Sequence, residues 1–282
     1  MTPLRRRMIE DMTLRNLSPA TQEAYVHQVE RFARHFGRPP DRLGPEEIRR
    51  YQVHLVEKEV SWSLFNQVVC ALRFFYTITL GGSVSVQAIP YAKRPRALPV
   101  VLSAEEVVRF LQAFRSEKQR AILMTAYAAG LRVSEITHLR VADIDSQRSV
   151  IHVHEGKGRK DRDVMLSPRL LEFLRKYWRK SRPKGEYLFP GESPNRPITR
   201  AAVAIACQKA VRDSGLLKRI TPHTLRHAFA THLLEAGTSA LIVQSLLGHR
   251  HLQTTLRYLH VSRSVSSVPS PLDSLSLVDK LS

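Results

Sequence analysis

The sequence of 282 residues contains only two cysteines, Cys70 and Cys207. Two cysteines cannot build the disulfide framework of a small secreted protein, and neither lies at a spacing typical of a zinc site. The sequence also lacks any run of about 18 apolar residues, which a membrane-spanning helix would need, and no apolar segment follows the basic N-terminal residues. We therefore expect a cytoplasmic protein that is neither secreted nor embedded in a membrane.

Acidic residues are few, with 25 Asp and Glu against 44 Lys and Arg and a net charge of +19. Residues 1–90 carry 12 basic and 9 acidic residues, so most of the positive charge lies in the remaining two thirds of the chain. Arginine outnumbers lysine 33 to 11, and its planar guanidinium matches the geometry of phosphate oxygens. Because no basic amphipathic helix indicates a membrane surface, this charge favours a nucleic acid as the partner.

Hydrophobic residues make up 43% of the chain, which excludes a disordered protein. After a Ser-Pro pair typical of a helix start, apolar residues recur at helical spacing at Tyr25, Val29, Phe32 and Phe36. Similar patterns up to residue 81 predict a bundle of about four helices. We interpret its aromatic stripe as a hydrophobic core rather than as a base-stacking platform.

Two β-rich segments interrupt the helical pattern of the second half. Residues 149–154 and 163–166 are β-branched or alternating, and the Gly-Lys-Gly sequence around Lys157 lies between them. They predict a β-hairpin or meander with a basic turn. The expected fold is mainly α with a small β-sheet, arranged as a helical bundle (1–81), a basic linker (82–101), a mixed α/β domain (102–262) and a C-terminal tail (263–282).

The predicted linker is rich in Gly, Ser and Pro and contains Lys93, Arg94 and Arg96. These three side chains are candidates to lie along a DNA backbone if the two domains clamp a duplex. A connector that is merely solvated is an equally good interpretation.

The segment ITPHTLRHAFATHLLEAG at residues 220–237 carries the clearest candidate site. Thr221 and Pro222 are typical of a helix start, and a glycine ends the segment. His223 and Arg226 then lie on one helical face at the positive end of the helix dipole, an arrangement suited to a phosphate. A histidine at a helix end is more often structural, so the pair needs support from elsewhere in the sequence.

Four other residues gain meaning only from their order in the chain. Arg132 follows a glycine break, Lys157 occupies the basic turn, His249 follows a helix-ending glycine, and Tyr258 lies in HLQTTLRYLH. Taken alone, Arg132 could cap backbone carbonyls and Tyr258 could fill a core.

Together these residues resemble the catalytic constellation of the tyrosine recombinase (phage-integrase) family. GLRVSE resembles the family's first arginine box, TPHTLRHAFATHLLEAG its His-x-x-Arg box, LLGH its second histidine box and TTLRYLH its nucleophile box. LSPATQEAYVHQVERFARHFG is similar to the first long helix of the family's N-terminal core-binding domain. The resemblance extends to about residue 262, and within the family it extends to Xer-like or mobile-element integrases with a catalytic second domain.

The resemblance implies a metal-independent reaction without a cofactor, in which Tyr258 attacks a DNA phosphodiester and forms a 3′-phosphotyrosyl link. Arg132 and Arg226 would clamp the phosphoryl oxygens, and His249 would bind the phosphate. Lys157 would protonate the departing 5′-oxygen.

Two further roles follow from the same resemblance. His223 would help to remove the phenolic proton, because the pKa of a free tyrosine is about 10. Glu135, three residues after Arg132, would support the site by orienting the arginine side chain, or it would only stabilise the helix turn.

Other histidines have more ordinary interpretations. His152 and His154 alternate on a strand and could contact a metal, but a third ligand is missing, so we expect a paired strand face. His227 and His232 are expected to pack or to face solvent.

The resemblance implies a site-specific recombinase that acts on double-stranded DNA with paired inverted repeats, associated with a prokaryotic nucleoid. It would work on two duplexes as a homotetramer or as an assembly with a paralogue. Two alternatives are a type IB topoisomerase, which relaxes supercoils as a monomer, and a DNA-binding relic without activity. A relic should have lost a catalytic residue, and none is missing.

Overall fold

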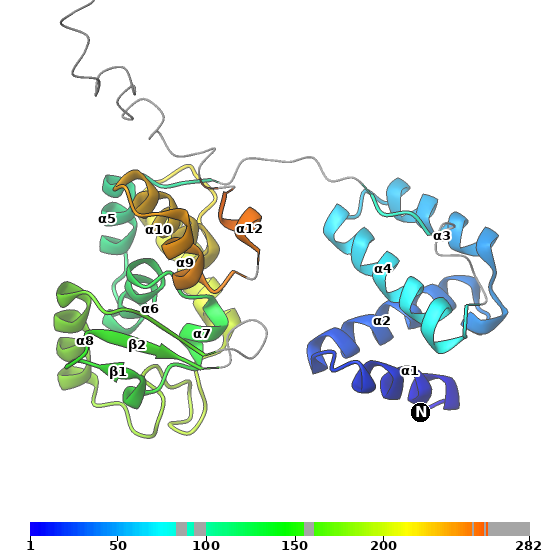
Figure 1. The fold of residues 1–282 in the computed structure, drawn as a ribbon, viewed down its shortest axis with the longest axis horizontal. Helices are drawn as coiled ribbons and strands as arrows, with labels where there is room; N and C mark the ends of the chain where they lie inside the picture. Colours follow the sequence, from blue (N-terminus) through cyan, green and yellow to red (C-terminus); the bar gives the residue numbers. More distant parts are fainter. Residues whose placement is uncertain (83–88, 93–99, 155–160, 250, 257, 259–282) are drawn as a thin grey trace, which may run out of the picture. The chain divides into compact units, whose positions relative to one another are not determined.

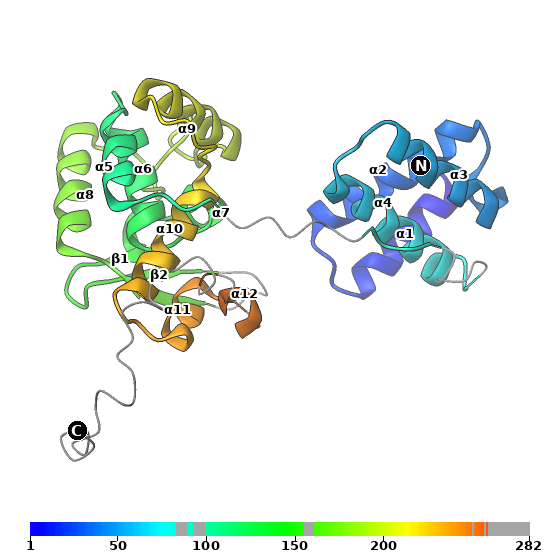
Figure 2. The same ribbon diagram turned by 90° about the horizontal axis from the view of Figure 1, so that it is seen from above.

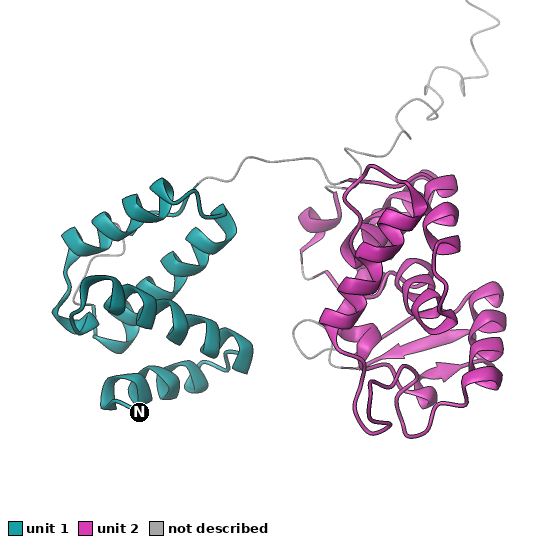
Figure 3. Cartoon of the chain, turned by 180° about the vertical axis from the view of Figure 1, so that it is seen from behind, with its two compact units in different colours: residues 1–96 teal, residues 97–282 magenta. Residues whose placement is uncertain are grey.

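The computed structural model describes residues 1–82, 89–92, 100–154, 161–249, 251–256 and 258. The chain divides into two compact units, residues 1–96 and 97–282 (Figure 3). Each unit contains a hydrophobic core built from its own residues. In the part of the chain that the structure describes, no helix has the length and apolar character needed to cross a membrane.

The first unit contains four α-helices: α1 (Pro3–Leu14), α2 (Pro19–Phe36), α3 (Pro45–Glu57) and α4 (Trp62–Phe74). A 3₁₀ turn (Pro40–Arg42) precedes α3, and a π-helical turn (Phe75–Thr79) continues α4. The side chains of Thr2, Ser18 and Ser61 accept hydrogen bonds from backbone N–H groups at three of the helix starts. The prediction of about four helices is confirmed.

Aromatic side chains form the centre of this unit. Phe32 is fully buried and meets Tyr51 edge to face, with ring centroids 5.2 Å apart. The hydroxyl of buried Tyr76 donates to the carbonyl oxygens of Pro40 and Leu43 at 2.7 and 2.9 Å. These contacts confirm that the aromatic stripe is a core.

Residues 89–92, inside the predicted linker, pack on the first unit. Ile89 is fully buried in its core, and Asn66 exchanges two hydrogen bonds with the backbone of Ala92. An apolar side chain and a paired backbone anchor this stretch, so the described part of the predicted linker belongs structurally to the bundle. Lys93, Arg94 and Arg96 lie outside the described residues.

The second unit is built around helix α6 (Glu117–Ala128), which contacts α5 (Ala104–Gln112), α7 (Val133–Thr137), α8 (Pro168–Ser181), α9 (Arg200–Ser214) and α10 (Pro222–Glu235) (Figures 1 and 2). Small and aliphatic residues of α6, such as Ala121, Ile122 and Ala126, are buried and allow these helices to approach closely. Two short helices, α11 (Ala240–Leu247) and α12 (Leu252–Leu256), follow α10.

The sheet has three antiparallel strands, β1 (Ile144–Asp145), β2 (Val150–Val153) and β3 (Arg162–Met165). Short β1 follows a 3₁₀ turn (Val141–Asp143). Val153 pairs with Arg162 and His152 with Asp163. Ile151, Val153 and Val164 are buried, so one face of the sheet covers the core. The predicted small sheet and the mainly α fold are confirmed. The sheet contains the predicted hairpin of β2 and β3 and one further strand, β1.

Candidate active site

Helix α10 begins and ends where its sequence predicts. The Thr221 side chain caps the helix by accepting from the N–H of Thr224 at 3.2 Å, and Pro222 occupies its first turn. This start places His223 and Arg226 one turn apart on the same face. His223 is exposed, but partial desolvation of its ring and the positive charges of Arg226 and Arg132 lower its pKa.

Arg226 connects two of the predicted motifs. Its side chain is buried, at 2% exposure, and its Nη1 and Nη2 donate to the carbonyl oxygens of Gly130 and Leu247. Gly130 has a φ of +60°, and a Cβ there would lie 2.4 Å from the Phe229 ring, so only glycine fits. Burial and nearby Arg132 lower the pKa of Arg226 to about 10, which leaves it charged at neutral pH.

Glu135 holds two arginines in place next to Arg226. The Nη1 of Arg132 donates to Glu135 at 2.7 Å, and both Nη atoms of Arg162 donate to the two carboxylate oxygens at 3.0 and 2.9 Å. Burial by itself raises the pKa of Glu135, but hydrogen bonds from Arg162 and the Arg132 backbone lower it to about 2. The third guanidinium is that of Arg226, whose Nη1 lies 3.9 Å from the Glu135 carboxylate. Three guanidiniums thus surround one carboxylate, which leaves an excess of two positive charges.

Tyr258 enters this cluster from the segment after α12. It is 4% exposed, and its hydroxyl lies 3.0 Å from Nδ1 of His227 on α10. The ring of His249 lies nearly parallel to the Tyr258 ring at 6.2 Å, and Nδ1 of His249 is 2.9 Å from the hydroxyl of Thr255. The negative charge of Tyr258, when ionised, also acts on Arg226.

The structure therefore brings together five of the six predicted catalytic residues: Arg132, His223, Arg226, His249 and Tyr258. Glu135 contacts both the side chain and the backbone of Arg132. These contacts are compatible with both expected roles, which are to orient the arginine side chain and to stabilise the helix turn. Lys157 lies outside the described residues. The strands on either side of its segment end at Val153 and begin again at Arg162, which contacts Glu135.

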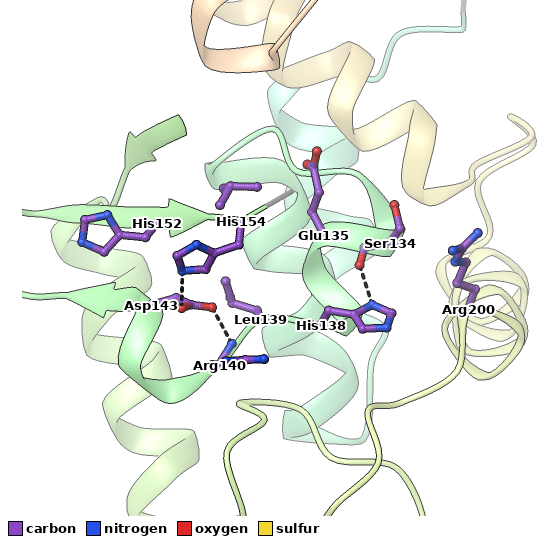
Figure 4. A pocket seen from close by; sticks show the side chains of 10 residues that line it. Ser134, Glu135, His138, Leu139, Arg140, Asp143, His152, His154 and Arg200 are labelled. Carbon is purple, nitrogen blue, oxygen red and sulfur yellow. Dashed lines mark hydrogen bonds and ion pairs between the residues drawn. The ribbon is translucent and has the colours of Figure 1, made fainter. Parts of the chain in front are cut away.

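A polar cavity of about 600 Å³ adjoins this cluster, and its wall includes Ser134 and Glu135 (Figure 4). His154 Nε2 faces Asp143 at 3.1 Å, and His152 Nδ1 faces Asp163 at 2.7 Å. No group of three or more potential metal ligands occurs among the described residues. His152 lies opposite Asp163 in the sheet, as expected for a paired strand face. His154 lies just beyond the end of β2 and contacts Asp143 of the 3₁₀ turn, so it is not on the strand as expected.

The sequence did not predict that Arg162 and His227 belong to this cluster. Arg162 lies on the same, apolar face of its strand as Val164, and a lone arginine on a buried face is the signal that could have revealed it. His227 lies one turn after His223, but its contact with Tyr258 depends on how the chain returns after α12. His232 packs as expected, between the hydroxyl of Tyr127 and the carbonyl of Leu102.

A helical bundle followed by a mixed unit in which arginine, histidine and tyrosine side chains converge defines a tyrosine recombinase. Residues 100–264 match the model of the phage integrase family, and residues 4–85 match the N-terminal SAM-like domain of phage integrases. The chain belongs to the phage integrase family and is a tyrosine site-specific recombinase.

Similar proteins span nearly the whole chain. The putative integrase/recombinase y4qK of Sinorhizobium fredii is 53% identical over 278 residues, covering 98% of this chain and 90% of that protein. Tyrosine recombinase XerA of Thermococcus kodakarensis is 33% identical over 274 residues, covering 96% and 94%.

Solved structures agree with this assignment. The crystal structure of XerA recombinase has 29% identity and a TM-score of 0.57, covering 95% of this chain and 98% of that one. XerH bound to its palindromic difH substrate has 21% identity and a TM-score of 0.72, covering 94% and 82%, and shows the shared fold.

Proposed function

We propose that this chain cleaves and rejoins DNA strands through a covalent 3′-phosphotyrosyl intermediate at Tyr258. The observation that supports this most is that Tyr258 is buried beside a cluster with an excess of positive charge. It lies close enough to Arg226 for the two charges to interact when Tyr258 is ionised. A buried phenol needs no arginine cluster if it only fills a core. An oxygen nucleophile that attacks a phosphodiester does need one, because negative charge increases on the non-bridging oxygens.

In the cleavage step the Tyr258 oxygen bonds to phosphorus while the bond from phosphorus to the 5′-oxygen breaks. Arg226 uses two of its five N–H groups on backbone carbonyls, which leaves three for the phosphoryl oxygens. Arg132 is held in the same way by Glu135 and by the carbonyl of Gly248 at 3.3 Å. Both guanidiniums are thus oriented before substrate binds, which lowers the cost of stabilising the transition state.

The remaining roles are those that the family resemblance implies. Lys157 donates a proton to the departing 5′-oxygen, and His249 donates a hydrogen bond to the phosphate. The resemblance implies that His223 helps to remove the phenolic proton, but the Tyr258 hydroxyl contacts His227 instead, at 3.0 Å. We therefore assign His223, at the start of α10, a hydrogen bond to the phosphate, where the helix dipole favours an anion. The phosphotyrosyl bond conserves the energy of the broken phosphodiester, so a 5′-hydroxyl of another strand can replace Tyr258 without a cofactor.

The substrate we propose is double-stranded DNA with paired inverted repeats. Four copies of the chain, or copies of the chain and a paralogue, would hold two duplexes during strand exchange. Two structural neighbours support DNA as the partner: XerH is bound to a palindromic site, and a lambda integrase dimer is bound to a core site. The net charge of +19 is suited to such a partner.

Tyr258→Phe tests this proposal, since it removes the nucleophilic oxygen and keeps the ring. Incubated with a nicked duplex that carries the inverted repeats beside its own gene, the wild-type protein should form a protein–DNA band that survives denaturant, also in EDTA. The variant should bind this DNA and form no such band. Tyr187→Phe is the matched control and should behave like wild type.

A covalent band in the Tyr258→Phe variant would show that another residue is the nucleophile. A strict requirement for divalent ions would contradict charge stabilisation by arginines. Relaxation of supercoiled plasmid that lacks the repeats, by the protein as a monomer, would indicate a topoisomerase instead.

A further inference from the structure

The hydroxyl of Tyr258 and the imidazole of His227 form a direct contact. The two groups are 3.0 Å apart, and their ring centroids are separated by 5.3 Å at an angle of 53°. A phenol that donates to Nδ1 requires this nitrogen to be unprotonated, so the ring proton of neutral His227 lies on Nε2. In this tautomer His227 presents a lone pair to the Tyr258 oxygen.

The surroundings of His227 favour its neutral form. Burial lowers its pKa to about 4, assisted by the positive charges of His223 and Arg226 on its own helix. The His223 and His227 rings lie nearly parallel with centroids 5.9 Å apart. Facing His227 from the segment after α12 is Tyr258, with His249 nearly parallel to the Tyr258 ring.

We propose that His227 is the base that receives the phenolic proton of Tyr258, a role that rests on the proposed function of Tyr258 as nucleophile. As the bond from the Tyr258 oxygen to phosphorus forms, the proton moves to Nδ1 of His227 and makes an imidazolium. The bond from phosphorus to the 5′-oxygen breaks, and that oxygen takes its proton from Lys157. In rejoining, the 5′-hydroxyl attacks phosphorus and gives its proton back to Lys157, and Tyr258 leaves with the proton returned by His227.

The scissile phosphate itself makes this transfer feasible. Two of the causes that lower the His227 pKa are positive charges, on His223 and Arg226, and a bound phosphodiester offsets both. The phenol also becomes more acidic as its oxygen bonds to phosphorus. His227 is therefore a weak base without DNA and a stronger one with it, so proton transfer depends on a bound phosphate.

His227→Asn separates the transfer of a proton from mere positioning. The Asn amide oxygen occupies nearly the place of Nδ1 and can accept the same hydrogen bond, but it cannot take the proton. In single-turnover cleavage of a nicked duplex at pH 7, we expect His227→Asn and His227→Ala to be slower than wild type by about 100-fold. The deficit should shrink as the pH rises towards 10, because hydroxide then replaces the base. Exposed His138, changed to Asn, is the matched control.

The outcomes distinguish three cases. If His227→Asn cleaves at nearly the wild-type rate with the same pH profile, His227 only positions Tyr258 and the proposal fails. If wild-type protein forms no covalent product, or Tyr258→Phe still forms one, the proposed function itself fails. Retained half-site binding by His227→Asn shows that the variant is folded.

A second measurement does not depend on a His227 variant. In Tyr258→Phe protein, the protonation midpoint of His227, followed by NMR, should rise when DNA with an intact scissile phosphodiester binds. It should not rise with a neutral methylphosphonate at that position. An equal midpoint with both DNAs would overturn the argument.

Discussion

At the scale of single residues, the carboxylate of Glu135 determines how the positive charges of the site are arranged. Its side chain is 6% exposed and contacts Arg132 and Arg162, and Arg226 lies 3.9 Å away. Without it, buried guanidiniums would face one another with no compensating charge, which is costly in a medium of low polarity. Glu135 therefore compensates the charges of the arginines that the proposed reaction uses.

Glu135→Gln should lower the free energy of unfolding of the second unit by about 3 kcal/mol at pH 7. The folded pKa of about 2 lies below the unfolded value of about 4.3, so this stabilisation is complete above the unfolded pKa and is lost as pH falls towards 2. Urea denaturation followed by Trp178 fluorescence in a Trp62→Phe background measures it.

The difference between wild type and Glu135→Gln should shrink between about pH 4 and pH 2. Exposed Glu172, changed to Gln, serves as the control and should have little effect. An equal loss of stability at every pH would contradict the role of the ionised carboxylate.

At the scale of elements, the β2–β3 hairpin is attached to the site at its base. Arg162 begins β3, binds Glu135 of α7 and donates through Nε to the carbonyl of Leu246 in α11 at 2.8 Å. Val153 lies opposite Arg162 in the sheet register. Both ends of the segment that carries Lys157 are thus held beside the arginine cluster, which supports Lys157 as the general acid.

Lys157→Ala should slow cleavage by about 100-fold while DNA binding changes little. A substrate with sulfur at the 5′-bridging position should largely restore the rate, because a thiolate leaves without a proton. Cleavage of both substrates by the variant is measured under single-turnover conditions, with exposed Lys184 changed to Ala as the control. If sulfur gives the variant no advantage, Lys157 does not protonate the leaving group.

At the scale of the whole molecule, the two units have separate cores, and residues 263–282 form the C-terminal tail. The tail carries apolar residues at Val265, Val268, Leu272, Leu275, Leu277 and Val278 between prolines and serines, and it lies outside the described residues. Apolar residues require a burial site, and we propose that a neighbouring subunit provides it. A head-to-tail exchange of this kind closes into a ring of subunits.

Truncation after Arg263 should weaken assembly on paired sites by about tenfold or more and leave binding to a single half-site unchanged. Mobility-shift titrations on half-sites and on paired sites provide the comparison. A truncated protein that assembles and recombines at the full-length rate would show that the tail folds on its own domain or does not contribute.

The sequence by itself determined the helix boundaries and the order of the motifs, because these depend on neighbouring residues. Ser18-Pro19 and Thr221-Pro222 start helices through local caps, and a glycine is needed at the break before Arg132. Only the tertiary structure decided which side chains meet. Arg162 is 27 residues from Glu135, and His227 is 31 residues from Tyr258. Such contacts depend on how β3 packs on α11 and how the chain returns to α10, and no local pattern encodes that packing.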